Sequence, residues 1–266
     1  MNIVVCVKYV PDAQADRTFE DADHTTDRVG VDGRLSELDE YAVEEALKIV
    51  EAGGGEGDQV TVLTVGPESA AEAVKKSLQM GAHAGVHVSD DAIAGSDAAA
   101  TSLVLAKAIE KLGTETKVDL VLTGMASTDG TMSVVPAMLA ERLGLPQVTY
   151  ASEVTVSGDS VTIRRDGDAS TQTITSSLPA VVSVTDQINE PRYPSFKGIM
   201  AAKKKPVQAW GIGDLGIDAG DVGLAAAWTT VESVTARPPR EAGQVVTDEG
   251  EGGAKLAEFL VSRKFV

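Results

Sequence analysis

The residues best suited to chemistry lie at 119–144, in the stretch DLVLTGMASTDGTMSVVPAMLAERLG. The apolar run at 120–123 predicts a strand that is buried on both faces. Residues 134–143 predict a helix, because Pro136 falls in its first turn and Gly144 follows its last residue. The loop between them is rich in Gly, Ser, Thr and Asp. Since a helix start carries unpaired N–H groups and partial positive charge, this loop is predicted to hold a nucleotide phosphate.

The same loop also fits a simpler interpretation, in which Ser133 only caps the helix that follows. Neither GxGxxG nor GxxxxGK[ST] occurs in the chain, so the usual dinucleotide and P-loop signatures give no support to phosphate binding. From this stretch alone, both interpretations stay open.

Bulk composition narrows the class of protein. With 266 residues, 43% of them apolar, the chain can bury a full core. No apolar segment is long enough for a membrane helix and no signal-peptide pattern occurs, so we expect a cytoplasmic protein without membrane insertion. A net charge of -17 argues against nucleic acid as a partner. The same acidity suggests a halophilic source as a hypothesis. Cys6, the only cysteine, is expected to be a buried thiol.

Apolar runs alternate with helical patterns through residue 144. This alternation predicts an α/β fold with a Rossmann-like, doubly wound parallel sheet, whose ligands bind beyond the carboxyl ends of the strands. Loops beginning at Lys8, Val65 and Gly124 lie at those ends. A hydroxyl at Ser36 and a carboxylate at Asp39 predict a variant capping box that opens a helix. Strands are expected at 2–8, 60–65, 86–88 and 120–123, and the helices that follow at 36–52, 68–80, 96–112 and 134–143, with Gly81 and Gly113 as terminators.

Polar and apolar residues alternate after Pro146, which predicts antiparallel hairpins over 154–174 that extend the edge of the sheet. A further buried strand is expected at 180–185. We therefore divide the chain into a nucleotide-binding domain (1–185), a partner-recognition loop with a lysine cluster (186–206), and an extended C-terminal arm (207–266). The arm ends in an amphipathic helix at 253–264, which we expect to pack on a partner subunit.

The most specific motif is NEPRYPSFKGIMAAKKKP at 189–206, preceded by LPAVVSV at 178–184. With DEYAVEEALKI at 39–49 and the loop described first, it resembles the beta (small) subunit of an electron-transfer flavoprotein over essentially the whole chain. The resemblance implies a nucleotide-binding fold of the adenine nucleotide alpha hydrolase-like type. It further implies a heterodimer with an alpha subunit, one FAD shared at the interface, and a structural AMP in this subunit.

In this resemblance, electrons come from acyl-CoA or related flavin dehydrogenases and pass to a quinone reductase. The phosphate is expected on the backbone N–H groups of residues 129–133 and the hydroxyls of Thr131 and Ser133, with Cys6 and Val65 beside the adenine. The implied cofactor-binding residues are Cys6, Ser36, Glu37, Leu38, Asp39, Val65, Gly124, Asp129, Gly130, Thr131, Met132, Ser133, Val134 and Val135.

The loop at 192–200 resembles the recognition loop of the family, with Phe196 at a place usually held by leucine. An aromatic anchor can supply much of the energy of a small interface, and lysines next to it can steer an acidic partner. The implied partner-binding residues are Arg192, Tyr193, Phe196, Ile199, Met200, Lys203 and Lys204.

Three alternatives remain from the sequence. The chain could be an ATP-dependent ligase or pyrophosphatase on the same architecture, or a nucleotide-binding stress protein, which its long tail disfavours. It could also be a beta subunit with a second FAD for electron bifurcation, although such subunits tend to show DGDTAQVGP where this chain has DGTMSVVP. We expect no catalytic residue and no metal site, because His24, His83 and His87 lie near no candidate nucleophile or metal ligand in the sequence.

Overall fold

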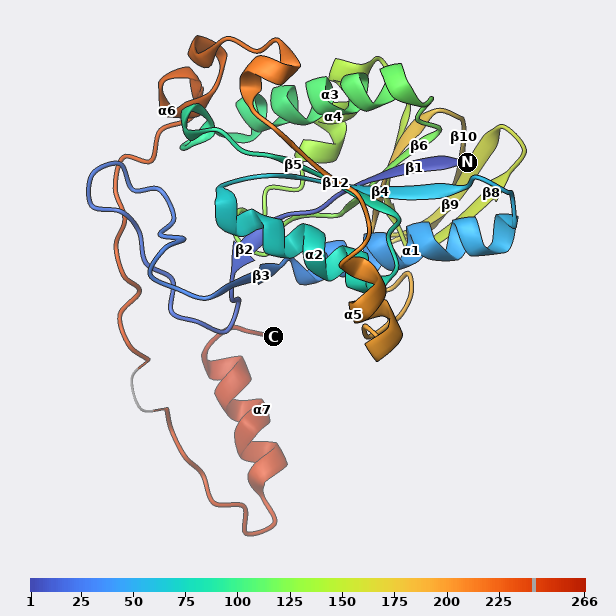
Figure 1. The fold of residues 1–266 in the computed structure, drawn as a ribbon. Helices are drawn as coiled ribbons and strands as arrows, with labels where there is room; N and C mark the ends of the chain where they lie inside the picture. Colours follow the sequence, from blue (N-terminus) through green and yellow to red (C-terminus); the bar gives the residue numbers. More distant parts are fainter. Residues whose placement is uncertain (241–242) are drawn as a thin grey trace. The chain divides into compact units, whose positions relative to one another are not determined.

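A computed structural model describes residues 1–240 and 243–266. It consists of two compact units, Met1–Glu232 and Ser233–Val266. The first unit holds the sheet, the residues predicted to bind a nucleotide and the predicted partner-recognition loop (Figure 1), while the terminal helix that is predicted to pack on a partner lies in the second unit.

In the described residues, a parallel sheet of seven strands forms the centre of the first unit. Its strand order is β12-β5-β4-β1-β6-β11-β7. The order reverses direction beside β1, as in a doubly wound sheet. This confirms the predicted fold class. The strands are β1 (Asn2–Cys6), β4 (Gln59–Val65), β5 (Ala84–Val88), β6 (Leu120–Gly124), β7 (Gln147–Ala151), β11 (Ala180–Val184) and β12 (Val207–Trp210).

Helices cover both faces of the sheet (Figure 1). Alternate residues of β1 point to opposite faces, so Ile3 and Val5 join one apolar cluster and Val4 and Cys6 join the other. The helices α1 (Glu37–Gly53) and α2 (Ala71–Met80) pack in the first cluster, and α3 (Ala98–Glu115) and α4 (Val135–Leu143) in the second. Because both faces are covered, the strands read as continuous apolar runs.

One predicted helix cap and one predicted helix end are corrected. Ser36 stands at the N-cap of α1, but within the described residues its side chain makes no capping hydrogen bond. Asp39 instead accepts a hydrogen bond from the backbone N–H of Lys8, at 2.8 Å. The helix α3 continues through Gly113 to Glu115, because a glycine in a helix costs only about 1 kcal/mol relative to alanine. The predicted stops at Gly81 and Gly144 are confirmed.

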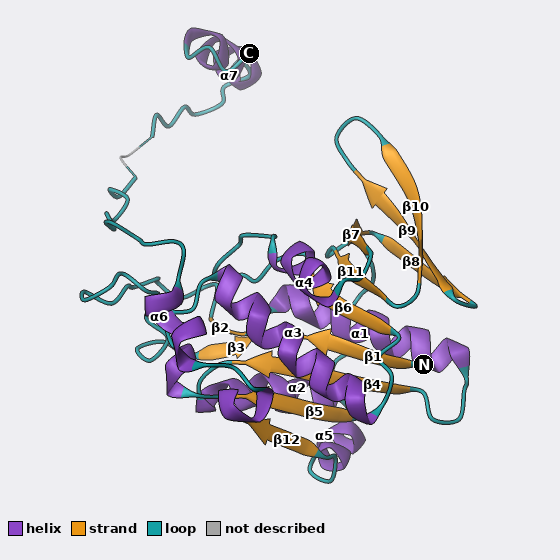
Figure 2. Ribbon diagram, turned by 90° about the horizontal axis from the view of Figure 1, so that it is seen from above, coloured by secondary structure: helices purple, strands orange, loops and turns teal. Residues whose placement is uncertain are grey.

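The antiparallel hairpins are confirmed but do not join the main sheet. Strands β8 (Glu153–Ser157), β9 (Ser160–Asp166) and β10 (Thr171–Ser177) form a sheet of their own, in the order β10-β9-β8, next to the edge strand β7 (Figure 2). Val161 and Ile163 of β9 are buried in the core beside β7. The hairpins therefore extend the fold by packing rather than by strand pairing with β7.

The predicted C-terminal arm begins inside the sheet. Residues 207–210 form β12, which pairs in parallel with β5, and Trp210, Ile212 and Leu215 are buried in the core. A strand here was missed because it is short and three of its four residues are exposed. Short helical segments precede and follow it: α5 (Phe196–Ala202), η3 (Ile212–Leu215), η4 (Ala219–Asp221) and α6 (Gly223–Ala226).

The remaining elements are peripheral. Strands β2 (Tyr9–Pro11) and β3 (Gly33–Leu35) form a two-stranded ribbon that closes the loop over residues 12–32, and η1 (Glu68–Ala70) and η2 (Asp91–Ile93) follow β4 and β5. In the second unit, the predicted terminal helix is confirmed as α7 (Gly252–Ser262), with Leu256 and Val261 exposed. Its packing on a partner stays a prediction. Over the residues described, every helix is too short or too polar to cross a bilayer.

Candidate nucleotide site and docking loop

The carboxyl ends of three neighbouring strands bring the predicted nucleotide residues to one edge of the sheet. Cys6 pairs with Leu63 of β4 and with Thr123 of β6. Ser36 donates its backbone N–H to the Lys8 carbonyl oxygen at 2.8 Å, which places the start of α1 beside the end of β1. At Gly124, an added Cβ would lie 2.7 Å from both Asp39 Oδ1 and the Leu38 carbonyl oxygen. The approach of α1 to β6 therefore requires glycine at this position.

The turn between β6 and α4 is open to solvent. Gly130, Thr131 and Met132 are exposed. Thr131 has φ 51° and Ser133 has φ 58°, a left-handed conformation that is costly for residues other than glycine and is concentrated at binding sites. The structure corrects the simpler interpretation of Ser133, because the N-cap is Val134 and, within the described chain, no side chain caps α4. The first N–H groups of α4 thus stay free of a side-chain cap.

Two basic side chains converge on the buried carboxylate of this turn. Lys8 Nζ lies 2.9 Å and an Arg28 guanidinium nitrogen 2.5 Å from Asp129 Oδ2, while the Asp129 side chain is 0% exposed. Arg17 donates to the Thr128 carbonyl oxygen at 2.8 Å. Burial raises the pKa of Asp129, but Lys8, Ser127 and Arg28 together hold it well below its usual range. Three basic side chains, Lys8, Arg17 and Arg28, therefore gather at this turn in a strongly acidic chain.

Sequence reasoning did not include Lys8, Arg17 and Arg28 in the site. The loop over residues 12–34 showed no usable pattern, and Arg28 meets Asp129 across 101 residues of sequence. One signal was present: Lys8 directly follows an apolar strand, at the edge where ligands bind in α/β sheets. The scarcity of basic residues in this chain makes such a position conspicuous.

Burial raises the pKa of two titratable groups at the sheet edge, Asp39 and Cys6. Desolvation raises the pKa of Asp39 to about 7, against hydrogen bonds from the N–H groups of Lys8 and Gly124 that favour its charged form. Burial, followed by the charge of Asp39, raises the pKa of Cys6 to about 12. The Cys6 thiol is therefore neutral and unreactive, which fits a residue that lines a binding site rather than a nucleophile.

Two buried hydroxyls at this edge support a polar ligand. Ser36 Oγ and Thr64 Oγ1 are enclosed, and neither has a hydrogen-bond partner in the part of the chain that the structure describes. Buried polar atoms in proteins are nearly always paired. Ser36 lies at the start of α1 and Thr64 near the carboxyl end of β4, on the face covered by α1 and α2. Donors and acceptors of a nucleotide fit a site with such groups.

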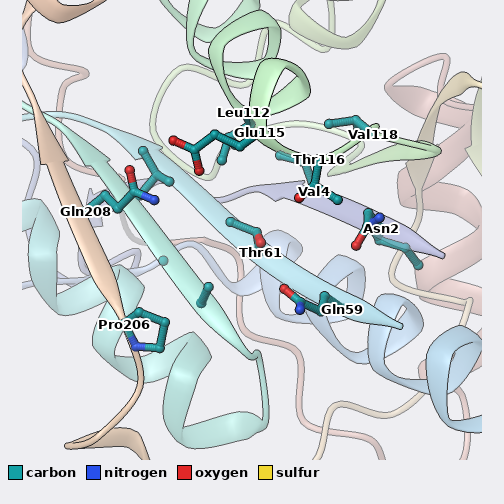
Figure 3. Close-up of a pocket in the computed structure, with 14 residues that line it drawn as sticks. Asn2, Val4, Gln59, Thr61, Leu112, Glu115, Thr116, Val118, Pro206 and Gln208 are labelled. Atoms are coloured by element: carbon teal, nitrogen blue, oxygen red, sulfur yellow. The ribbon is translucent and has the colours of Figure 1, made fainter. Parts of the chain in front are cut away.

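A separate cavity of about 210 Å³ lies at the opposite end of the strands (Figure 3). Its lining includes Asn2 and Gln59, the first residues of β1 and β4, together with Glu115 and Thr116 at the end of α3 and Gln208 of β12. Because ligands of α/β sheets bind at the carboxyl ends, this cavity is not the candidate nucleotide site.

Residues 193–200 of the predicted partner-recognition loop, called the docking loop from here on, present large apolar side chains. Tyr193 is 91% and Phe196 80% exposed, and Ile199 and Met200 of α5 are exposed beside them. Lys203 and Lys204 are exposed as well. Arg192 differs, since its guanidinium pairs with Glu44 and Glu51 of α1. Lys205 also turns inward, donating to the carbonyl oxygens of Leu78 and Gly81 at 2.9 and 3.0 Å.

Two of the three histidines, His83 and His87, occupy structural positions. His87 Nε2 lies 3.1 Å from the carbonyl oxygens of Gly66 and Pro67, and His83 Nδ1 accepts the Val60 N–H at 3.0 Å. In residues 1–240 and 243–266, no three His, Cys, Asp or Glu side chains gather closely enough to hold a metal ion.

Comparison with known proteins identifies the class. The family model described as the electron transfer flavoprotein domain matches residues 23–215, which is most of the chain. The chain therefore belongs to the electron transfer flavoprotein family, and its general role is electron transfer.

Two of the three relatives described here are named as beta subunits of electron transfer flavoproteins. The chain is 48% identical over 267 residues to the electron transfer flavoprotein subunit beta of Mycobacterium tuberculosis, covering 100% of this chain and 99% of the relative. It is 35% identical over 263 residues to the corresponding subunit of Clostridium acetobutylicum, covering 99% and 97%. It is also 34% identical over 263 residues to CarD of the caffeyl-CoA reductase-Etf complex of Acetobacterium woodii, again covering 99% and 97%. The resemblance inferred from the sequence motifs is thereby confirmed.

Proposed function

We propose that this chain pairs with an alpha subunit and holds an AMP at the carboxyl edge of its sheet, while one FAD lies at the interface between the subunits. In this proposal the heterodimer takes electrons from acyl-CoA or related flavin dehydrogenases and passes them to a quinone reductase in the cytoplasm. The FAD supplies the redox chemistry, and this subunit supplies binding and docking surfaces.

The observation that carries the nucleotide proposal is the convergence of Lys8 and Arg28 on Asp129 in the exposed turn before α4. In this proposal a phosphate beside residues 129–133 would bind the N–H groups at the start of α4, the Thr131 and Ser133 hydroxyls, and the cations Lys8 and Arg28. The N–H groups of Gly130 and Thr131 already donate to Asp129 Oδ1 at 2.7 Å and to the Ser127 carbonyl oxygen at 3.0 Å, which corrects the expectation that these two groups hold the phosphate. Charge-assisted hydrogen bonds of this kind are the strongest that a phosphate makes. Residues 36–39, Cys6 and Val65 complete the proposed site at the neighbouring strand ends.

A beta subunit with a second FAD is the other candidate, because one relative belongs to a caffeyl-CoA reductase-Etf complex. The altered loop DGTMSVVP favours AMP. Nucleotides extracted from the purified heterodimer decide between the two. We expect one AMP and one FAD per heterodimer, whereas two FAD molecules and no AMP would overturn the AMP proposal.

An ATP-using ligase or pyrophosphatase is a further alternative from the sequence. None of the three relatives named above carries such an activity in its name. The electron-transfer proposal predicts that the chain does not turn over ATP and that a yellow complex forms when the alpha subunit is co-expressed. ATP hydrolysis in proportion to the amount of this chain would contradict it.

The docking proposal rests on Tyr193 and Phe196, since aromatic side chains this exposed commonly mark protein interfaces. Phe196→Ala should raise the KM of a partner dehydrogenase for the heterodimer about tenfold or more, as for removal of an interface anchor. Flavin content should not change. Val29→Ala removes an equally exposed apolar side chain from another loop and serves as the control.

A further inference from the structure

The segment before the docking loop is fastened to α1 by a forked ion pair. Arg192 Nε and one terminal nitrogen donate to the two carboxylate oxygens of Glu44, at 2.7 and 3.1 Å. Its terminal nitrogens also donate to the two oxygens of Glu51, at 2.6 and 3.0 Å. Both glutamates lie on α1, two helical turns apart, so one planar guanidinium bridges them.

Asn189 adds a second attachment to the same helix. Its side-chain nitrogen donates to the Tyr41 carbonyl oxygen and to Glu45 Oε2, at 3.0 Å each. Glu44 and Glu45 are both buried, although charged residues are buried in proteins almost only when they are paired. The helix α1 thus directs two buried carboxylates at segment 189–192. These contacts hold the chain immediately before the exposed Tyr193.

We propose that Arg192, Asn189, Glu44 and Glu51 form a latch whose function is to position the docking loop, residues 193–200, for its partner. Arg192 is then a positioning residue rather than a partner contact, which revises its role in the sequence analysis. This inference rests on the proposed docking function. Fixing the loop before binding lowers the entropic cost of association.

The latch predicts a defined kinetic effect. If only a fraction of molecules holds the loop in the docking position, the apparent affinity for the partner falls by that fraction. Loosening the latch should therefore raise KM for the heterodimer and leave kcat unchanged, because the flavin is not affected. A direct contact between Arg192 and the partner predicts a different pattern, in which changes at Glu44 have little effect.

The experiment uses the heterodimer with an acyl-CoA dehydrogenase of the same source and compares Glu44→Gln, Arg192→Gln and the double variant. Glu44→Gln should raise KM about five- to tenfold, as for a docking population reduced to a tenth or a fifth. The KM of the double variant should not exceed that of Arg192→Gln alone, because both changes remove the same Arg192–Glu44 ion pair. A Glu44→Gln variant with unchanged KM, beside a raised KM for Arg192→Gln, would overturn the latch.

A second variant covers the case in which Glu44→Gln fails to fold. Glu51 is 56% exposed, so Glu51→Gln should fold. It should raise KM about two- to threefold, less than Glu44→Gln, because solvent partly screens the Arg192–Glu51 pair. Amide hydrogen exchange should increase over residues 193–202 and stay unchanged in β1 and β4. Unaltered exchange and KM in Glu51→Gln would overturn the latch. Glu110→Gln, which breaks the exposed pair with Lys107 on α3, is the matched control with no expected effect.

The Phe196→Ala variant separates failure of the latch from failure of the docking proposal. If Phe196→Ala raises KM and the latch variants do not, the loop docks without the latch. If Phe196→Ala leaves KM unchanged, the docking function of the loop fails, and the latch fails with it.

Discussion

Lys8 Nζ lies 3.0 Å from Asp129 Oδ1, across 121 residues of sequence. The contact joins the end of β1 to the turn before α4 and connects two strand ends of the parallel sheet at the proposed nucleotide site. Because Lys8 and Arg28 both face the single carboxylate of Asp129, one positive charge is left in excess beside the free N–H groups of the helix, which favours a phosphate.

Replacing Lys8 tests that contact. Lys8→Gln leaves Asp129 with Arg28 as its remaining cation, so the free energy of unfolding should fall by about 1–2 kcal/mol, as for loss of a hydrogen bond to a charged group. The AMP content of the purified heterodimer should fall in the same variant. Lys107→Gln breaks a solvent-exposed pair with Glu110 and should cost less than about 0.5 kcal/mol. Equal unfolding midpoints and equal AMP content for the two variants would contradict a role of Lys8 at the site.

The buried carboxyl of Asp39 should cause the free energy of unfolding to fall as pH rises. Its pKa is raised by burial from 3.8 to about 7, so between these values the folded chain keeps a proton that the unfolded chain has lost. The stabilisation is complete at low pH and is lost as pH rises through 7, with a slope of up to about 1.4 kcal/mol per pH unit. Asp129, whose pKa is lowered, is ionised in both states above pH ~5.

Unfolding midpoints of the wild type and Asp39→Asn, measured from pH 5 to pH 8, isolate this effect. The midpoint of the wild type should decline with pH relative to that of the variant. Parallel curves for the two proteins would show that Asp39 does not hold a proton in the folded state.

Thr131 combines an unfavourable backbone conformation with a hydroxyl at the proposed phosphate site. With φ 51°, this β-branched residue is strained by about 1–3 kcal/mol, and glycine would relieve the strain at an entropic cost of about 0.5–1 kcal/mol. Thr131→Gly should therefore fold at least as stably as the wild type but retain less AMP. His24 also has a positive φ, 59°, so His24→Gly is the backbone control, with full AMP content expected. Full AMP occupancy in Thr131→Gly would exclude a binding role for its hydroxyl.

Local signals in the sequence were sufficient to predict most of the helices and strands. Pro136 and Gly144 fixed the limits of α4, and buried apolar runs fixed the central strands, because these signals act within one element. The capping box at Ser36 failed because Asp39 is engaged by the distant N–H of Lys8. The strand at Val207–Trp210 escaped detection since its pairing with β5, not its own pattern, makes it a strand.

The site was only partly predictable for a related reason. Gly124 ends β6 and Asp129 lies in the turn that follows, and the residue types of this stretch allowed both to be predicted as site residues. Arg28 comes from a loop without pattern, and only the folded chain brings it to Asp129. For Arg192 the motif predicted a partner contact, whereas the structure turns its guanidinium toward Glu44 and Glu51 of α1.

The acidic composition predicts a dependence of stability on salt. A net charge of -17 destabilises the compact state through repulsion, and salt screens that repulsion. The unfolding midpoint should therefore rise from low to molar KCl, which also tests the hypothesis of a halophilic source. A midpoint that does not respond to KCl would leave that hypothesis without support.

The three consecutive lysines should have different roles: Lys205 stabilises the fold, whereas Lys203 and Lys204 act in docking. Lys205 donates to the carbonyl oxygens of Leu78 and Gly81 at the end of α2, so Lys205→Met should lower stability by about 1–2 kcal/mol, the cost of leaving such acceptors without a charged donor. Lys203→Met and Lys204→Met should change stability by less than about 0.5 kcal/mol, as for most exposed side chains.

The two exposed lysines should instead slow association with the partner dehydrogenase. Charges at the rim of an interface act mainly on the association rate, and salt screens their effect. Stopped-flow measurements at low and high ionic strength should show a slower rate for Lys203→Met and Lys204→Met that converges with the wild type at high salt. Lys205→Met should keep the wild-type association rate at both ionic strengths. A rate loss in Lys205→Met equal to that in Lys204→Met would contradict this division of roles.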